Sequence, residues 1–278
     1  MRAGTSRGRV RSPRPRPGRC GRRCRRRPAR HDTRRARRGR ARRPLYPPRA
    51  RLRAVSPPQS AVRAFQRRLL AWYARHGRDL PWRRTRVPYR VLVSEIMLQQ
   101  TQVERVIPKY RQFLRAYPSL RALAAADVDE VRKLWYPLGY NIRPVRLHAI
   151  ARETVARYNG RLPDDGEALR ALPGVGRYTA GAVLSFAFGR DAAVLDTNVR
   201  RVLGRVFFGP RRLGRLRGEA RLWDLAESLV PAGRGYDFNQ ALMDFGATWC
   251  TPRRPRCAPC PMRRFCATFS TLAAADRA

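Results

Sequence analysis

The chain has 278 residues, of which 62 are Lys or Arg and 19 are Asp or Glu, so its formal net charge is +43. A charge of this size points to a polyanionic partner, above all a nucleic acid. The sequence has no apolar run long enough to span a membrane and no signal-peptide core, so we expect an intracellular, reducing setting and no membrane partner. In that setting a cluster of cysteines indicates a metal more often than disulfides.

The most basic part of the chain is residues 1–53, which hold 23 Arg and one Asp. Like charges and low hydrophobicity are typical of a solvated, disordered arm. Two other interpretations stay open: an organelle transit peptide, and a gene start placed too far upstream. Cys20 and Cys24 lie in this segment without a second pair beside them, so we take them as incidental.

Ordered structure is expected from about Val55, and it begins with a helix. The apolar side chains of residues 61–78 recur at helical spacing: Val62, Phe65, Leu69, Trp72 and Tyr73. Residues 219–230 and 237–250 have the same period. The sequence shows no pair of alternating strands joined by a hairpin turn. It therefore predicts an all-α fold.

Two further segments carry helix boundary signals. Residues 127–140 open with Asp127 as a predicted N-cap and Glu130 as its capping-box partner. Residues 146–160 close on Asn159-Gly160, a predicted C-terminal stop.

Residues 172–183 read LPGVGRYTAGAV, with Gly174 and Gly176 on either side of Val175 just before an expected helix. Glycine permits a tight turn and a close approach of the backbone to a ligand. The start of the following helix offers free N–H groups and a positive dipole end to an anion. A lone G-x-G is weak evidence, but between two helices of a basic chain it predicts a helix-hairpin-helix clamp on duplex DNA phosphates.

Four cysteines with the spacing C-x₆-C-x₂-C-x₅-C lie close together near the end of the chain: Cys250, Cys257, Cys260 and Cys266. Thiolates suit zinc or an iron–sulfur cluster. A structural zinc site usually takes its thiolates from two close pairs, and here there is one close pair. One loop that wraps around its metal favours the bulkier cluster, although the spacing leaves both metals open.

Two carboxylates are candidates for catalysis. Glu95 lies among apolar and amide side chains, where desolvation would raise its pKa and let it act as a general acid. Asp196 follows the hairpin segment; Asn198 could orient it, and Arg200 and Arg201 could reach phosphate. Asp196 could equally serve only as the N-cap of the next helix. Together, the two acids suit cleavage of a C–N glycosidic bond, one protonating the base and one stabilising the sugar cation.

From about Leu69 to Cys266 the chain resembles the endonuclease III superfamily of helix-hairpin-helix DNA glycosylases, and most of all its MutY-type adenine glycosylases. The matching stretches occur in the family's order: LPWR, SEIMLQQTQV, LWYPLGY, LPGVGRYTAGAV, LDTNVRRVLGRVF, FNQALMDFGATWC and the cysteine loop. The resemblance implies two helical lobes that flank a DNA-binding cleft. One is a six-helix domain over 80–188; the other is an iron–sulfur domain made of 54–79 and 189–278.

The resemblance also implies a 4Fe-4S cluster on Cys250, Cys257, Cys260 and Cys266, which braces a basic loop against DNA. That loop carries Arg253, Arg254 and Arg256. We expect a monomer that acts on mispaired double-stranded DNA, located in a bacterial cytoplasm and associated with the nucleoid through DNA, unless the Arg-rich tail directs it to an organelle.

Residue roles follow from the same resemblance. Glu95 would protonate the purine, and Asp196, with Asn198 beside it, would stabilise the oxocarbenium ion. Gln100 would enter the base stack near the estranged base. The residues expected around the opened duplex and the flipped adenine are Leu98, Thr101, Tyr140, Trp82, Arg83 and Gln240. Flipping costs least at a mispair, which contributes to selectivity.

Tyr178 separates the branches of the superfamily. Bifunctional glycosylase–lyases place a lysine between G-V-G-x and T-A, where it forms a Schiff base with the sugar. This chain has Tyr178 there, which favours a monofunctional hydrolase. A tyrosine at this place also occurs in related thymine glycosylases that act on G·T mispairs. A mismatch glycosylase for another base therefore stays as an alternative. A non-catalytic DNA-binding relative is a further alternative, against which the presence of both Glu95 and Asp196 argues.

The chain departs from the adenine glycosylase pattern in two respects. Pro137, Asn141 and Pro144 replace the usual residues in PLGYNIRPVRL, beside the expected substrate pocket. The chain also ends about a dozen residues after Cys266, so we expect the family's separate domain that reads 8-oxoguanine to be absent. Preference for 8-oxoguanine over guanine as the opposite base is left open.

Overall fold

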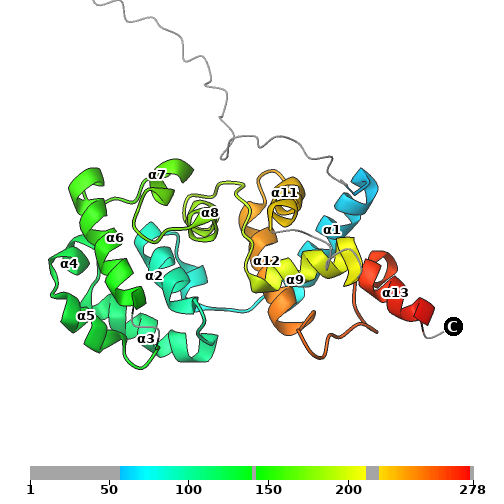
Figure 1. Cartoon of the computed structure of the whole chain (residues 1–278), viewed down its shortest axis with the longest axis horizontal. Helices are drawn as coiled ribbons and strands as arrows, with labels where there is room; N and C mark the ends of the chain where they lie inside the picture. The colour runs from blue at the N-terminus through cyan, green and yellow to red at the C-terminus, as the bar shows by residue number, and fades with distance from the viewer. Residues whose placement is uncertain (1–56, 140–141, 211–218, 276–278) are drawn as a thin grey trace, which may run out of the picture. The chain divides into compact units, whose positions relative to one another are not determined.

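The computed structural model describes residues 57–139, 142–210 and 219–275. Within these ranges the chain forms helices and no strand, as the sequence predicts (Figure 1). The Arg-rich residues 1–53, with Cys20 and Cys24, lie outside the described residues, and so does Tyr140. None of the helices described is both long enough and apolar enough to cross a lipid bilayer.

A first group of helices packs around one hydrophobic cluster, whose fully buried members include Val93, Trp135 and Ile150. α2 lies against α3, α6 and α8, and α6 lies against α4 and α5 (Figure 1). The elements are η1 (Pro81–Arg84), α2 (Pro88–Leu98), α3 (Val103–Ala116), α4 (Leu120–Ala125), α5 (Val128–Trp135), α6 (Ile142–Tyr158), α7 (Gly166–Arg170) and α8 (Arg177–Phe186).

A second group packs around another cluster and joins segments from far along the chain. α12 lies against α1 and α9, and the ring of Phe65 on α1 meets Phe207, Phe238 and Phe265 edge-on. The elements are α1 (Gln59–His76), α9 (Thr197–Leu203), the π-helical turn η2 (Gly204–Phe208), α11 (Ala220–Leu229), α12 (Gly235–Thr248), η3 (Arg263–Phe265) and α13 (Ala267–Ala275).

The two clusters share a packed boundary. Val91 on α2 and Ala182 on α8 belong to the second cluster, although their helices also build the first. The division into 80–188 and 54–79 with 189–278 stays a prediction. The boundary matters because the candidate site lies along it.

The predicted start of α5 is confirmed. Asp127 is its N-cap, and its carboxylate accepts hydrogen bonds from the backbone N–H groups of Asp129 (2.8 Å) and Glu130 (3.1 Å). The other half of the expected capping box differs, because the carboxylate of Glu130 pairs with Lys133 at 2.7 Å. The start of α5 is therefore stabilised by the side-chain cap of Asp127 and, separately, by the ion pair between Glu130 and Lys133.

The helix ends also follow from local sequence. α5 stops at Trp135, well before the end of segment 127–140, because a residue that precedes proline is driven out of the helical region. Tyr136, before Pro137, accordingly has an extended ψ of 137°. The stop predicted at Asn159-Gly160 is confirmed, since both residues have positive φ, 51° and 75°.

Candidate active site

One cavity of about 620 Å³ brings together most of the residues that the sequence singled out. Its walls come from both helix groups: η1, α2 with the turn after it, and α8 on one side, and residues 195–200 with α12 on the other. The predicted site residues that line it are Trp82, Arg83, Glu95, Leu98, Gln100, Thr101, Tyr178, Asp196, Asn198 and Gln240. Gly174, Gly176 and the four cysteines do not line it.

Glu95 lies on α2, a helix that is buried on almost every side, and is itself only 3% exposed. The hydroxyl of Tyr178 donates a hydrogen bond of 2.7 Å to Glu95 Oε2. Burial raises the pKa of Glu95 to about 7, and the charge of Asp196 adds to the rise. The Tyr178 hydrogen bond and the charge of Arg83 act in the opposite direction. A carboxyl group of this kind is half protonated at neutral pH, as a general acid requires.

Tyr178 is the second residue of α8, directly after the glycine turn. Burial and the charges of Glu95 and Asp196 raise its pKa well above the ordinary value, so the phenol stays neutral and can only share its proton. The side chain at the family's lysine position is therefore a hydrogen-bond donor to the candidate acid. It offers no amine for a Schiff base.

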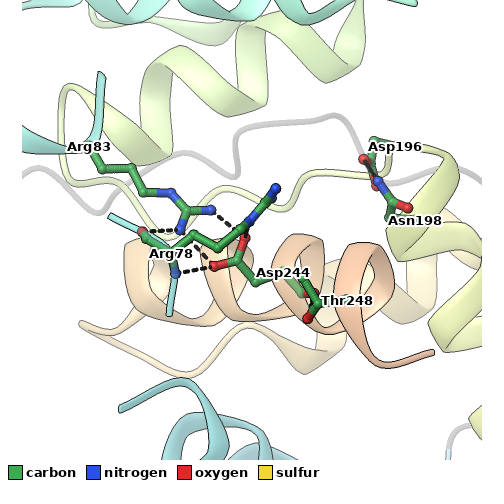
Figure 2. Close-up of polar contacts among 6 residues, drawn as sticks. All are labelled: Arg78, Arg83, Asp196, Asn198, Asp244 and Thr248. Atoms are coloured by element: carbon green, nitrogen blue, oxygen red, sulfur yellow. Dashed lines mark hydrogen bonds and ion pairs between the residues drawn. The ribbon is translucent and has the colours of Figure 1, made fainter. Parts of the chain in front are cut away.

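Asp196 serves both functions that the sequence left open, since it caps a helix and faces the cavity. Its Oδ1 accepts a 2.6 Å hydrogen bond from the backbone N–H of Val199, in the first turn of α9. Asn198 Nδ2 donates 2.9 Å to Oδ2, as expected, and lies beside it in Figure 2. Burial raises the pKa of Asp196, while these two hydrogen bonds and the charge of Arg201 oppose the rise. Both carboxylate oxygens are thus held in place.

The expectation that Arg201 reaches phosphate is wrong. Its guanidinium is turned inward, where it donates 2.7 Å to Asn198 Oδ1 and 2.8 Å to the carbonyl of Cys250. Carbonyl groups at a helix end lack helical partners and can accept hydrogen bonds from an arginine side chain. Arg200 stays on the surface at the cavity rim, paired with Glu219 at 3.0 Å. Arg201 therefore supports Asn198 from behind.

The sequence analysis missed a buried ion network of Arg78, Arg83 and Asp244, which Figure 2 shows. Asp244 on α12 has a side chain that is 0% exposed, and it accepts two hydrogen bonds from Arg83, at 2.7 and 2.8 Å. Arg78 adds its Nε (2.7 Å) and its backbone N–H (2.9 Å). Burial alone would raise the pKa of Asp244, but the hydrogen bonds and charges of Arg83 and Arg78 hold it below the ordinary value.

This network gives Arg83 a second task besides lining the cavity. Its bidentate contact with Asp244 ties η1, on one wall, to α12, on the other. The signal that could have revealed it is a lone acid in the apolar helix segment ALMDFG, since a buried carboxylate requires a partner.

The glycine turn has the predicted place between two helices, α7 and α8. Gly174 has a φ of +75°, and a Cβ there would lie 3.0 Å from the side chain of Arg146, a cavity-lining residue that the sequence analysis missed. Gly176 is the N-cap of α8 without a side-chain cap, and a Cβ there would meet nothing within 4 Å. Arg177 is held aside by Glu227 at 2.6 Å. No side chain caps the start of α8, so its first N–H groups are candidates for contact with an anion.

The cysteine loop begins at the end of α12 and runs past η3. Its four cysteines are partly buried and form no disulfide. Burial raises the pKa of Cys260 to about 11; the backbone N–H of Met262 opposes the rise, and the charges of Cys266, Cys250 and Cys257 add to it. Over the ranges described, no three His, Cys, Asp or Glu side chains are arranged around a single-ion position.

Arg205, on η2, holds the two ends of this loop and was missed in the sequence, where it is one arginine among many. Its guanidinium donates to the carbonyl of Thr251 at 2.7 Å and contacts Cys250 Sγ at 3.5 Å. Its carbonyl accepts from Cys266 Sγ at 3.5 Å and from Thr268 Oγ1 at 2.9 Å. N–H groups directed at sulfur suit thiolates that act as ligands.

The structure has two helix groups with a cavity at their boundary. A glycine turn between two helices lies near the cavity, and two carboxylates held by hydrogen bonds lie within it. These features define a helix-hairpin-helix protein whose site is suited to glycosidic chemistry. The chain belongs to the HhH-GPD superfamily of base excision DNA repair proteins, whose family model matches residues 93–228. The family and the all-α fold that we expected from the sequence are thereby confirmed.

Three relatives illustrate the similarity. The adenine DNA glycosylase of Rattus norvegicus is 47% identical over 218 residues, which are 74% of this chain and 42% of the relative. The chain thus spans about two fifths of the length of that relative. A solved thermostable thymine-DNA glycosylase is 38% identical with a TM-score of 0.72, covering 77% of this chain and 98% of the other. A trapped endonuclease III–DNA covalent intermediate shares the fold, with 22% identity, a TM-score of 0.68 and coverage of 78% and 99%.

Proposed function

We propose that the chain is a monofunctional DNA glycosylase that hydrolyses the N-glycosidic bond of adenine mispaired with guanine or 8-oxoguanine. The observation that carries the proposal is the placement of Glu95 and Asp196 in one cavity, the first held by Tyr178 and the second by Asn198. The 47% identity with an adenine DNA glycosylase supports adenine as the excised base.

The two carboxylates have opposite tasks in this reaction. Glu95, with its raised pKa, donates a proton to the purine ring, so that the base leaves as a neutral molecule. Asp196 remains ionised and stabilises the positive charge that develops on the sugar as the C–N bond breaks. Asn198 and the N–H of Val199 keep its oxygens in a fixed direction.

The same site argues for hydrolysis without strand cleavage. Tyr178 stands where a lyase has its lysine, and it is engaged with Glu95. The two lysines of the described residues lie elsewhere, Lys109 bonded to Gln112 and Lys133 to Glu130. The proposed product is an intact strand with an abasic site, which breaks only after alkali is added.

The proposed partner is double-stranded DNA with a mispair, bound by a monomer. The uncapped N–H groups at the start of α8 suit a phosphate, and Arg253, Arg254 and Arg256 are exposed on the cysteine loop. Such contacts fix the position on the duplex but read no sequence. Selectivity then comes from the ease with which a mispaired base leaves the stack and from its fit in the cavity.

We also propose that Cys250, Cys257, Cys260 and Cys266 hold a 4Fe-4S cluster. The backbone N–H donors to Cys260 and Cys266 and the Arg205 contact with Cys250 suit thiolate ligands, and a bound metal would offset the burial that raises the pKa of the free thiols. When bound, the cluster would cross-link the loop that carries the exposed arginines. Analysis of anaerobically purified protein should find about four irons per chain. Zinc without iron would overturn this assignment.

A second candidate is removal of thymine opposite guanine, which the 38% identity with a thymine-DNA glycosylase favours. A panel of duplexes with A·8-oxoG, A·G, T·G and U·G, assayed with and without alkali, separates the two. The adenine duplexes should break after alkali treatment, and faster excision from T·G than from either adenine duplex would establish the second candidate. Glu95→Gln protein purified in parallel controls for a contaminating glycosylase.

A further inference from the structure

Arg143, in the first turn of α6, is a fully buried arginine, with 0% of its surface exposed. It lies outside the cavity lining, yet its guanidinium is directed at two loops beside the cavity mouth. Burying a guanidinium is costly unless its donors are matched, so the identity of its partners indicates what it is for.

The first loop is the turn between α2 and α3. Arg143 Nη1 donates to the carbonyls of Met97 (2.7 Å) and Gln99, and Nη2 donates 3.0 Å to Thr101 Oγ1. These contacts satisfy carbonyl groups that the end of α2 leaves without helical partners. They also fix the backbone on both sides of Gln100.

The second loop follows α5. Arg143 Nη2 donates 3.0 Å to the carbonyl of Leu138 and 2.8 Å to that of Gly139, whose φ is +71°. Thr101 Oγ1 lies 3.4 Å from the same Leu138 carbonyl, so the two loops touch each other as well. One guanidinium therefore joins both loops to the start of α6.

Gln100 is the residue that this arrangement presents. It is exposed, it lines the mouth of the cavity that holds Glu95, and its φ is +54°. A residue other than glycine persists in this left-handed region only when its surroundings enforce it. Under the proposed function, a base that enters the cavity would leave a gap in the duplex, and Gln100 is an exposed residue that lines this cavity.

We propose that Arg143 is a positioning residue for base extrusion: it holds the turn of residues 99–101 so that Gln100 is ready to fill the gap left by the extruded base. The inference rests on the proposed glycosylase function. Preforming the turn removes the cost of ordering it when DNA binds. Lysine would not replace arginine here, because a single ammonium lacks the planar fork that reaches both loops at once.

The test is a double-mutant cycle on single-turnover excision from an A·G duplex. Arg143→Lys should slow excision at least tenfold, as should Gln100→Ala. The excision rate of the double variant should be within about twofold of the rate of the slower single variant, because both changes remove the same function, the placement of the Gln100 side chain. Arg157→Lys, an exposed arginine of the same helix, is the matched control and should leave excision unchanged.

A purely structural role for Arg143 predicts a different pattern, in which the two losses multiply in the double variant. Multiplying losses, or an Arg143→Lys rate within about twofold of the unaltered protein, would overturn the inference. If Arg143→Lys does not fold, Thr101→Val takes its place in the cycle, because this change removes the hydroxyl that accepts a hydrogen bond from Arg143. Thr101→Val should slow excision less than Arg143→Lys would. In the Gln100→Ala background it should cause no further slowing. Absence of excision by the unaltered protein would reject the proposed function instead, so the two failures are distinguishable.

Discussion

The hydroxyl of Tyr178 donates a hydrogen bond of 2.7 Å to the carboxylate of Glu95, which lies 83 positions earlier in the chain. This contact couples the helix that follows the glycine turn to the candidate acid. It favours the ionised carboxylate, while burial disfavours it more strongly. The acid is therefore balanced between its two protonation states near neutral pH.

The pH dependence of excision should reflect that balance. Glu95 must be protonated to act, so the single-turnover rate should fall above about pH 7, approaching tenfold per pH unit. Asp196 must be ionised to act. Because its pKa is raised, the loss of rate at low pH should be centred above pH 3.8, the ordinary pKa of an aspartate. Rates measured from pH 4.5 to 9 check both limbs. A rate that still increases between pH 7 and 9 would contradict the role of Glu95.

Removing either acid should separate binding from chemistry. Glu95→Gln keeps the shape and the Tyr178 contact but has no proton to give, and Asp196→Asn loses the counter-charge to the sugar cation. Each should bind a mispaired duplex almost normally and lose excision by about 10²-fold or more. Single-turnover excision and gel-shift affinity measure the two effects. Excision by Glu95→Gln within about tenfold of the unaltered protein would remove Glu95 as the acid.

The buried acid should also cost stability as pH rises. Between the ordinary pKa of 4.5 and the folded value of about 7, the native state holds a proton that the unfolded chain has released. Stability of the unaltered protein should therefore decline over this range by about 1.4 kcal/mol per pH unit relative to Glu95→Gln. The variant should be the more stable one at pH 8, by roughly 3 kcal/mol. Urea unfolding at pH 5 and 8 tests this, with the exposed Glu104→Gln as the control.

Asp244→Asn should destabilise the fold strongly. It removes the carboxylate charge that accepts two hydrogen bonds from the guanidinium of Arg83, and breaking a buried ion pair from one side typically costs about 3–5 kcal/mol. The matched control is Asp164→Asn, which breaks the surface pair with Arg190 and should cost less than about 1 kcal/mol. Equal unfolding midpoints for the two variants would show that the buried network contributes little.

Arg205→Met should weaken the cysteine loop while it keeps most of the side-chain volume. It removes the donors to Thr251 and to Cys250 Sγ, so the iron content of the purified protein should fall clearly below that of the unaltered chain. Arg253→Met, an exposed arginine of the same loop, should retain full iron content and instead weaken DNA binding at low salt. Full iron occupancy in Arg205→Met would remove this role.

Much of the fold could be predicted from the sequence because its signals are local. A helix cap at Asp127 and a stop at Asn159-Gly160 act within one turn of chain, and the helical spacing of apolar residues needs no knowledge of their partners. The glycine turn and the cysteine spacing are likewise short patterns. Both candidate acids, Glu95 and Asp196, were identified from their sequence surroundings, the resemblance added their roles, and the structure places them in one cavity.

The tertiary structure alone decided which charged side chains face one another. Arg83 and Asp244 are 161 positions apart, and the sequence contains many arginines, each of which could have been the partner. Arg201 turned inward and Arg143 joined two loops because helix packing placed backbone carbonyls within their reach. Such choices depend on distances between helices, which are set by the packing of the whole core; a local pattern such as the lone acid in ALMDFG indicates that a partner is needed but does not identify it.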